Sequence, residues 1–390
     1  MKKVFFVVAI GALTNVAHAQ STVTLYGIVD EGINYNSNSG GHPLFNMSSG
    51  VLSGSRFGLR GSEDLGGGLK ALFNVENGFD ATSGKFSQGG LLFGRQAYVG
   101  LSNIRWGSAT LGRQYDALVD YVGVLGAADQ WGGYIVAHAG DIDNFNNAFR
   151  SNNTVKFSSA NFGGLSFGGT YSFGGVAGQF TQNQIWSLGA GYNRGPLVLG
   201  VGYLNARTPS NAGGLMGNNT TTATASVVSN PIYAGFTSAN TYQVAGAGAA
   251  YRFGATTVGA TYSNIKFMNL GANGNSSFRA GETATFNNAE LNFKYQITPA
   301  LLLGAAFDYT RGSSVVQTNG VENRGSDYYQ GALAADYFLS KRTDVYVVGV
   351  YQKASGTNSR NQNAVAAINS LTASNSDRAT NVRIGIRHKF

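Results

Sequence analysis

Polar and apolar residues alternate along several segments of this chain. Residues 288–296 read Asn-Ala-Glu-Leu-Asn-Phe-Lys-Tyr-Gln, and the closing segment 381–390 repeats the pattern with arginines on its polar face. A period of two places successive side chains on opposite faces of a β-strand and would not segregate them on a helix. Charged residues in mid-strand require water on one face, whereas the opposite face suits hydrocarbon. The pattern therefore predicts a sheet that separates water from an apolar phase.

The lengths of the connections predict how many strands the sheet contains. Seven short turns are expected, at 64–68, 102–107, 160–164, 193–196, 253–255, 297–300 and 340–343. Eight long loops alternate with them, including the polar stretches 36–52, 115–150, 205–240, 264–285 and 354–379. This arrangement requires sixteen strands with both chain ends on the short-turn side. Outer-membrane barrels have this asymmetry, with short periplasmic turns and long external loops. We therefore predict an all-β, transmembrane antiparallel β-barrel of sixteen strands, wide enough to enclose an aqueous channel.

The N-terminus indicates export. Residues 1–19 combine Lys2 and Lys3, an apolar run and an Ala-His-Ala cleavage pattern, which predicts a signal peptide, with the barrel domain at 20–390. Removal of this segment lowers the formal charge from +8 to +6. The basic residues are dispersed, so no nucleic-acid partner is expected. The chain has no cysteine, which excludes disulfide scaffolds and thiol chemistry.

Several short motifs occur in an order that is informative as a set. They are Val23-Thr24-Leu25-Tyr26-Gly27, Ser55-Arg56-Phe57-Gly58-Leu59-Arg60-Gly61, Arg95-Gln96-Ala97-Tyr98-Val99-Gly100-Leu101, Leu111-Gly112-Arg113-Gln114-Tyr115-Asp116, Tyr337-Phe338-Leu339-Ser340-Lys341-Arg342-Thr343 and the terminal Phe390. Over residues 20–390 the chain resembles the Gram-negative outer-membrane general porin family of the β-proteobacterial type. The resemblance implies a homotrimer in outer-membrane lipid, with one pore in each monomer for passive diffusion of ions and small hydrophilic solutes. It also implies that the third external loop, 115–150, folds into the lumen.

The resemblance also implies which residues form the pore constriction. The wall arginines would be Arg56, Arg113 and Arg150, and they would face loop acids, with Asp129 first, Asp120 second and Asp116 third. Arg60 lies on the same strand face as Arg56, which adds it as a fourth candidate. The alternative is that an arginine pairs with a neighbouring carboxylate and only stiffens the wall. Fixed charges in a narrow pore concentrate counter-ions, so a basic wall predicts a modest anion preference, which acids in the external loops could invert.

Phe390 closes the last alternating strand at the chain end. In the family that this chain resembles, such a terminal aromatic is the signal read by the outer-membrane assembly machinery. The alternative is an ordinary aromatic at the membrane interface.

Other functions receive less support from the residues. An enzyme would need a base, and His42, His138 and His388 have no nucleophile at catalytic spacing, so we expect no catalytic site, no cofactor and no metal site. Two further classes stay open. A substrate-specific channel would be blocked by one solute at low concentration, and an adhesive or structural barrel would show no open-channel conductance.

Overall fold

The computed structural model describes residues 22–217 and 230–390. The predicted signal peptide, 1–19, lies outside the described residues, as does part of the long loop predicted at 205–240. No helix in the described ranges is both long and apolar enough to cross a membrane.

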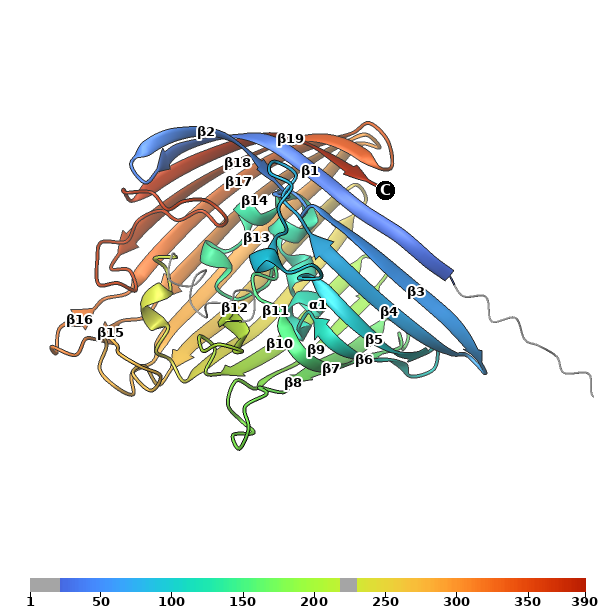
Figure 1. The fold of residues 1–390 in the computed structure, drawn as a ribbon. Coiled ribbons are helices and arrows are strands. Elements are labelled where there is room, and N and C mark those ends of the chain that lie inside the picture. The colour runs from blue at the N-terminus through green and yellow to red at the C-terminus, as the bar shows by residue number, and fades with distance from the viewer. Residues whose placement is uncertain (1–21, 218–229) are drawn as a thin grey trace, which may run out of the picture.

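The chain forms a closed antiparallel β-barrel whose strands follow one another in sequence order around the wall (Figure 1). The strands of the wall are β1 (Thr22–Ser39), β2 (His42–Ser49), β3 (Arg56–Gly66), β4 (Leu69–Gly78), β5 (Gln96–Asn103), β6 (Gly107–Gln114), β7 (Ser151–Ser159), β8 (Leu165–Ser172), β9 (Ile185–Arg194), β10 (Leu197–Arg207), β11 (Thr241–Phe253), β12 (Thr256–Met268), β13 (Ala284–Thr298), β14 (Leu301–Gly312), β17 (Ser326–Phe338), β18 (Thr343–Gly356) and β19 (Arg378–Lys389). A separate small hairpin, β15 (Val315–Val316) and β16 (Glu322–Asn323), lies in the loop between β14 and β17.

Closure occurs at β1, which pairs with β19 along one edge. Its other edge pairs with β3 over residues 22–28 and with β2 over residues 31–39. Because β2 and β3 share the same neighbour, they occupy one position in the wall, and residues 50–55 interrupt it. The described residues thus supply sixteen wall positions, which confirms the predicted strand count. The seven short turns also lie where they were predicted.

The prediction of a long polar loop at 36–52 is wrong. β1 continues to Ser39, and Gly40 and Gly41, both with positive φ, make a two-residue turn into β2. Asn34 on β1 donates a side-chain hydrogen bond of 2.8 Å to Ser48 on β2. The polar side chains of this hairpin are strand residues that face water in the lumen, so their polarity did not distinguish strand from loop.

The wall shows the predicted alternation of faces. Leu291 and Phe293 on β13 are exposed on the outer surface, whereas Glu290 and Asn292 between them are buried on the inner one. A closed sheet satisfies its backbone hydrogen bonds internally, which a strand in hydrocarbon requires. The outer surface therefore suits lipid, and the inner surface can hold the polar groups of a site.

A fully buried ion pair fixes the closing seam. Arg383 on β19 donates to the hydroxyl of Tyr346 on β18 at 2.7 Å and lies 3.3 Å from the carboxylate of Asp30 on β1. The other oxygen of Asp30 accepts the backbone N–H of Ser53 at 2.6 Å. The same cluster therefore positions the break between β2 and β3, immediately before Arg56.

Residues 115–150 form the third long loop, here called loop 3, and they run inside the barrel (Figure 1). The loop begins with the short helix α1 (Ala117–Tyr121), which contacts β9 and β10. Helical turns follow at Gly123–Leu125, Ala128–Gly132, Tyr134–Val136 and Ala139–Asp141. Other short turns lie in the remaining loops, at Gln88–Gly90, Leu215–Gly217 and Ala234–Phe236. The predicted inward fold of loop 3 is thus confirmed.

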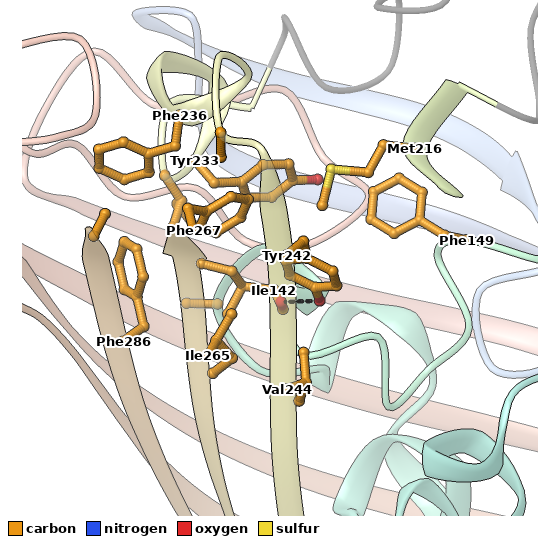
Figure 2. Close-up of a cluster of buried hydrophobic side chains, with 14 of the residues drawn as sticks. Ile142, Phe149, Met216, Tyr233, Phe236, Tyr242, Val244, Ile265, Phe267 and Phe286 are labelled. Atoms are coloured by element: carbon orange, nitrogen blue, oxygen red, sulfur yellow. Dashed lines mark hydrogen bonds between the residues drawn. The ribbon is translucent and has the colours of Figure 1, made fainter. Parts of the chain in front are cut away.

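A hydrophobic cluster lies beside the ends of β11, β12 and β13 that carry the long loops (Figure 2). Ile142 and Phe149 of loop 3 pack there with Tyr233 and Phe236 of a later loop, and the hydroxyl of Tyr242 on β11 donates to the carbonyl oxygen of Ile142 at 2.6 Å. Burial of each such side chain contributes roughly 1.5–3 kcal/mol. Loop 3 is therefore held against one side of the lumen.

Candidate functional site

A buried charge cluster anchors loop 3 to the wall. His138 Nδ1 lies 2.6 Å from the Asp143 carboxylate within the loop, and His138 Nε2 lies 3.5 Å from the carboxylate of Glu290 on β13. Burial alone would lower the pKa of His138, but the carboxylates of Asp143 and Asp308 raise it well above its usual value. Gln330 on β17 adds a hydrogen bond of 2.9 Å to the carbonyl oxygen of Ala137. His138 thus acts as a charged anchor in the middle of the loop.

Asp116, the third of the predicted loop acids, caps α1. One carboxylate oxygen accepts the backbone N–H of Leu118 at 2.7 Å, and the other accepts the side chain of Asn144 at 2.7 Å. Such a cap satisfies amide groups that a helix start leaves unpaired. Burial raises the pKa of Asp116 to about 6. The structure places this carboxylate within the folded loop, and it does not border either of the chambers described below.

Asp120, at the end of α1, pairs with the wall. Its carboxylate lies 2.5 Å from Nζ of Lys156 on β7, which also donates to the carbonyl oxygen of Tyr115 at 3.1 Å. Much of the negative charge of Asp120 is therefore balanced at short range.

We predict that Lys156→Met lowers the anion preference of a channel formed here, because it leaves Asp120 without its counter-ion. A partly exposed charge of this kind contributes about 0.5 kcal/mol, which corresponds to about a twofold change in the anion-to-cation permeability ratio. The zero-current potential in a salt gradient measures the ratio. Lys341→Met, in the exposed turn between β17 and β18, is the matched control, and an equal shift in both variants would contradict the role of Lys156.

Arg95, which the sequence analysis did not assign to the constriction, is a central residue of the wall. Its Nε lies 2.6 Å from the carboxylate of Glu76 on β4, and its Nη2 donates to the hydroxyl of Tyr115 at 3.1 Å. The Arg95 side chain is almost fully buried. Arg95 is the first residue of one of the motifs, so the sequence contained a sign of its role. It stands before β5, however, and the alternation of side chains along that strand did not predict that Arg95 points into the lumen.

Arg150, at the end of loop 3, lies over the other side of the same tyrosine. Its guanidinium carbon is 5.7 Å from the centre of the Tyr115 ring, a cation–π contact. The Arg150 side chain forms no salt bridge in the described residues, and its Nε has no hydrogen-bond partner there although it is buried. Tyr115 therefore holds Arg95 and Arg150 beside each other.

Arg56 and Asp129 face the same cavity. This cavity, the inner chamber, has a volume of about 340 Å³. Its charged and aromatic lining consists of Arg56, Arg95, Tyr115, Asp120, Asp129, Tyr134 and Phe145. Neither Arg56 nor Asp129 forms an ion pair in the described part of the chain, and Asp129 is exposed on the loop side. The chamber thus sets a basic wall against a loop that carries one unpaired acid.

A second cavity, the outer chamber, continues from the inner one. Its volume is about 440 Å³, and the two cavities share Gly54, Arg95, Tyr134, Asn146 and Asn147. Arg150 borders the outer chamber only, together with residues from the β1–β2 hairpin and from the loop that precedes β19. The two chambers therefore form consecutive parts of one passage, which runs between loop 3 and residues of β1, β2, the start of β3 and the loop before β5.

Three arginines near the passage act on the hydroxyl of Tyr134 in loop 3. Burial alone would raise the pKa of its hydroxyl, but Arg95, Arg150 and Arg56 together lower it below its usual value. Three guanidinium groups thus act on one point of loop 3, which is the arrangement expected of a basic constriction.

The remaining predicted arginines lie apart from these two chambers. Arg113 on β6 donates from Nε to the carbonyl oxygen of Gly94 at 2.8 Å and from Nη1 to Asn152. Arg60 on β3 stacks over Tyr26, 5.1 Å from the ring centre, in a separate recess that Glu76 also lines. The structure therefore brings Arg56 and Arg150 together with Arg95 in the passage, and it places Arg60 and Arg113 outside the lining of the two chambers.

The terminal residue completes the closing strand pair. The backbone N–H and carbonyl groups of Phe390 exchange two hydrogen bonds of 3.1 Å with Gly27 on β1. The Phe390 ring lies so close to Gly27 that a side chain at that position would collide with it. Glycine at 27 therefore makes room for the terminal aromatic ring.

Comparisons with known proteins agree on the type of barrel. A family model described as Gram-negative porin matches residues 7–357. An outer membrane porin protein of Bordetella pertussis is 37% identical over 235 residues, which are 53% of this chain and 60% of that protein. Outer membrane porin protein 32 of Delftia acidovorans is 34% identical over 223 residues, which are 53% of this chain and 61% of that protein. The matches thus span about 60% of the length of these two relatives.

The fold is also found among solved structures. The anion-selective porin from Comamonas acidovorans superposes with a TM-score of 0.70 at 21% sequence identity, over 95% of this chain and 100% of that one. OmpT of Vibrio cholerae, folded in vitro, superposes with a TM-score of 0.63 at 17% identity, over 96% of this chain and 100% of that one. At these identities the likeness shows the architecture of the barrel.

Proposed function

This chain belongs to the Gram-negative porin family, and from that premise we propose that it forms a water-filled channel in the outer membrane. Ions and small hydrophilic solutes would cross it by passive diffusion. The observation that carries the proposal is the passage between loop 3 and the wall near β1, β2 and the start of β3, which is lined by charged and polar groups. Such a channel performs no covalent chemistry and selects by width and by the charges that line its narrowest part.

We further propose that the channel prefers anions. Arg95 is balanced by Glu76, and Asp120 by Lys156, so these pairs contribute little net charge to the passage. Arg56 and Arg150 have no such partner in the described residues, whereas Asp129 is the unpaired acid that lines the inner chamber. Fixed positive charge in a narrow pore raises the local anion concentration. The opposed charges also create a field across the passage, which would orient dipolar solutes.

Reconstitution of the purified protein into planar bilayers tests the proposed channel. Stepwise increases in current that persist at low voltage are the expected result. An adhesive or purely structural barrel would insert without conducting, and that outcome would contradict the proposal. A swelling assay with proteoliposomes is an independent measure of solute entry. The proteoliposomes should swell in small sugars but not in large polysaccharides.

We propose a homotrimer, which rests on the family resemblance and is testable by cross-linking in native membranes.

We also propose that Phe390 is read by the outer-membrane assembly machinery before it pairs with Gly27. Deletion of Phe390 should then lower the amount of barrel in the outer membrane, while Phe253→Ala, at the exposed end of β11, should not.

A further inference from the structure

An apolar groove lies on the outer face of the barrel, across β13, β14, β17 and β18, which are neighbours in the wall (Figure 1). Its volume is about 610 Å³. Gly331 on β17 and Gly349 on β18 line it, and a side-chain carbon added at either glycine would meet no atom within 4 Å. The large side chains around the two glycines are exposed on the same face, and they are Leu291, Phe293, Phe307, Leu333 and Tyr351. The glycines thus leave a depression in a surface of large apolar side chains.

Two basic residues lie beside the groove, at the ends of β18 and β19 that carry a long loop. Lys353 follows Tyr351 by two residues on β18, so both side chains point outward. Arg378 on β19 is the strand-pairing partner of Lys353, and both basic side chains are exposed. Long loops mark the external side of an outer-membrane barrel, so these cations lie toward the outer leaflet of the membrane.

Two tyrosines place the basic pair at the level of the lipid headgroups. Tyr329 on β17 is paired with Lys353 across the strands. The ring of Tyr329 stacks on that of Tyr309 on β14, with 4.9 Å between the ring centres. Tyrosine rings collect at membrane–water interfaces, where one end of the side chain is apolar and the other is wet. The groove, which lies farther from the long loops, is therefore at the depth of the acyl chains.

The acids at this level do not cancel the positive charge. Arg378 lies 3.0 Å from Asp377, and Arg311 on β14 lies 4.0 Å from Asp327 on β17. Lys353 forms no salt bridge within the ranges that the structure describes. Exposed pairs of this kind are solvated and hold their partners weakly. Three cations against two acids leave one net positive charge beside the external end of the groove.

We propose that the groove is a binding site for a phosphorylated lipid of the outer leaflet. One acyl chain lies over the two glycines, and the phosphate contacts Lys353 and Arg378. Lipid covers the whole outer face of a barrel, but a chain that fills a depression gains contacts that a filled surface does not offer. Basic residues at a membrane surface attract anionic headgroups. A single lipid supplies the chain and the anion together, at the two depths where the groove and the cations lie. The site is on the outer face and is independent of the passage beside loop 3.

Native mass spectrometry of the folded protein, released from detergent micelles, tests the site. The micelles contain equal amounts of dimyristoyl phosphatidic acid and dimyristoyl phosphatidylcholine, which share their acyl chains and differ in net charge. The protein retains phosphatidic acid in about tenfold excess, because each cation at the headgroup level strengthens the binding of an anionic lipid. Equal retention of the two lipids overturns the proposal. Displacement of the lipid by inorganic phosphate also overturns it, because the cations would then bind a free anion without the chain.

Gly331→Leu combined with Gly349→Leu fills the groove, and the open space at both positions accommodates the new side chains. The retention of both lipids falls about fivefold, because the acyl chain loses its place in the depression. Ala190→Leu is the matched control on the outer face of β9, where its pairing partners Phe167 and Val201 are exposed. Gly331→Leu alone gives an intermediate loss and replaces the double variant if that variant does not fold. Unchanged retention in the filled groove contradicts the proposal.

Lys353→Met combined with Arg378→Gln removes the headgroup contacts. The excess of phosphatidic acid over phosphatidylcholine then disappears, whereas the retention of phosphatidylcholine stays the same. Lys341→Met combined with Arg342→Gln, in the short turn at the opposite ends of β17 and β18, removes the same charge and leaves the excess unchanged. An equal loss in both double variants overturns the proposal, because net charge alone then explains the preference.

The oligomeric state of the filled-groove variant distinguishes a lipid from a second copy of the chain. If filling the groove changes the oligomeric state and leaves the retention of lipid unchanged, a second copy occupies the groove and the proposal is wrong. The conductance of the same variants in planar bilayers tests the proposed channel separately, since none of the substituted residues borders the two chambers.

Discussion

Arg56→Glu combined with Arg150→Gln is expected to convert an anion-preferring channel into a cation-preferring one. Arg56 lines the inner chamber opposite Asp129, and Arg150 lines the outer chamber over Tyr115. Among the residues that line the two chambers, the double variant removes both cations without an acidic partner and adds one acid. The double variant changes the charge of the passage by three units. At about 0.5–1 kcal/mol for each unit in a partly water-filled passage, the anion-to-cation permeability ratio should fall by at least about tenfold.

The zero-current potential of the double variant in a potassium chloride gradient measures this change. Arg105→Glu, in the exposed turn between β5 and β6, changes the charge of the protein without changing the passage and is the matched control. The single variants should give intermediate potentials. If the double variant keeps the anion preference of the unmodified protein, these two arginines do not determine the selectivity.

His138→Leu is expected to release loop 3 from the wall. The substitution leaves the buried carboxylates of Asp143 and Glu290 without their shared cation. Removal of one partner from a buried ion pair typically costs about 3–5 kcal/mol. The loop should become sensitive to protease in the intact barrel, and the open-channel current should become larger and noisier. His42→Leu, on the exposed β2, should leave both properties unchanged.

A second substitution distinguishes loss of the ion pair from loss of packing. His138→Leu with Asp143→Asn removes both charges of the 2.6 Å pair, so it should recover part of the protease resistance that His138→Leu loses. No recovery would mean that the histidine ring acts mainly by packing.

The raised pKa of His138 also predicts how the stability of loop 3 changes with pH. Because the folded structure raises the pKa of His138, the stabilisation by its charge is fully present below about pH 6.5 and is lost as the pH rises through the raised value. The protease resistance of the unmodified protein should therefore decline at alkaline pH and approach that of His138→Leu. A constant difference between the two proteins at every pH would contradict a charged anchor.

The barrel was predictable from sequence because its two signals, alternation and turn length, are local. The failure at 36–52 follows from the same chemistry. Strand residues that face a wet lumen are as polar as loop residues, so Asn34, Asn46 and Ser48 gave no sign of the hairpin that they form.

The site was harder to predict from sequence than the barrel, because its residues come together only through the fold of loop 3. Arg95 became a wall residue through Glu76 and Tyr115, neither of which a motif connects to it. Asp116 has the expected residue type but caps a helix, and His138, which was examined as a catalytic base, anchors the loop. Which charges are paired depends on contacts between distant segments, and no strand pattern encodes those contacts.

We expect the passage beside loop 3 to carry a net positive field. The zero-current potential of the unmodified protein in planar bilayers, across a tenfold gradient of potassium chloride, tests the sign of this field most directly. Potassium and chloride have nearly equal mobilities in water, so the sign of the potential reports the charge of the pore. We predict a potential that corresponds to a modest preference for chloride. A clear preference for potassium would contradict the account.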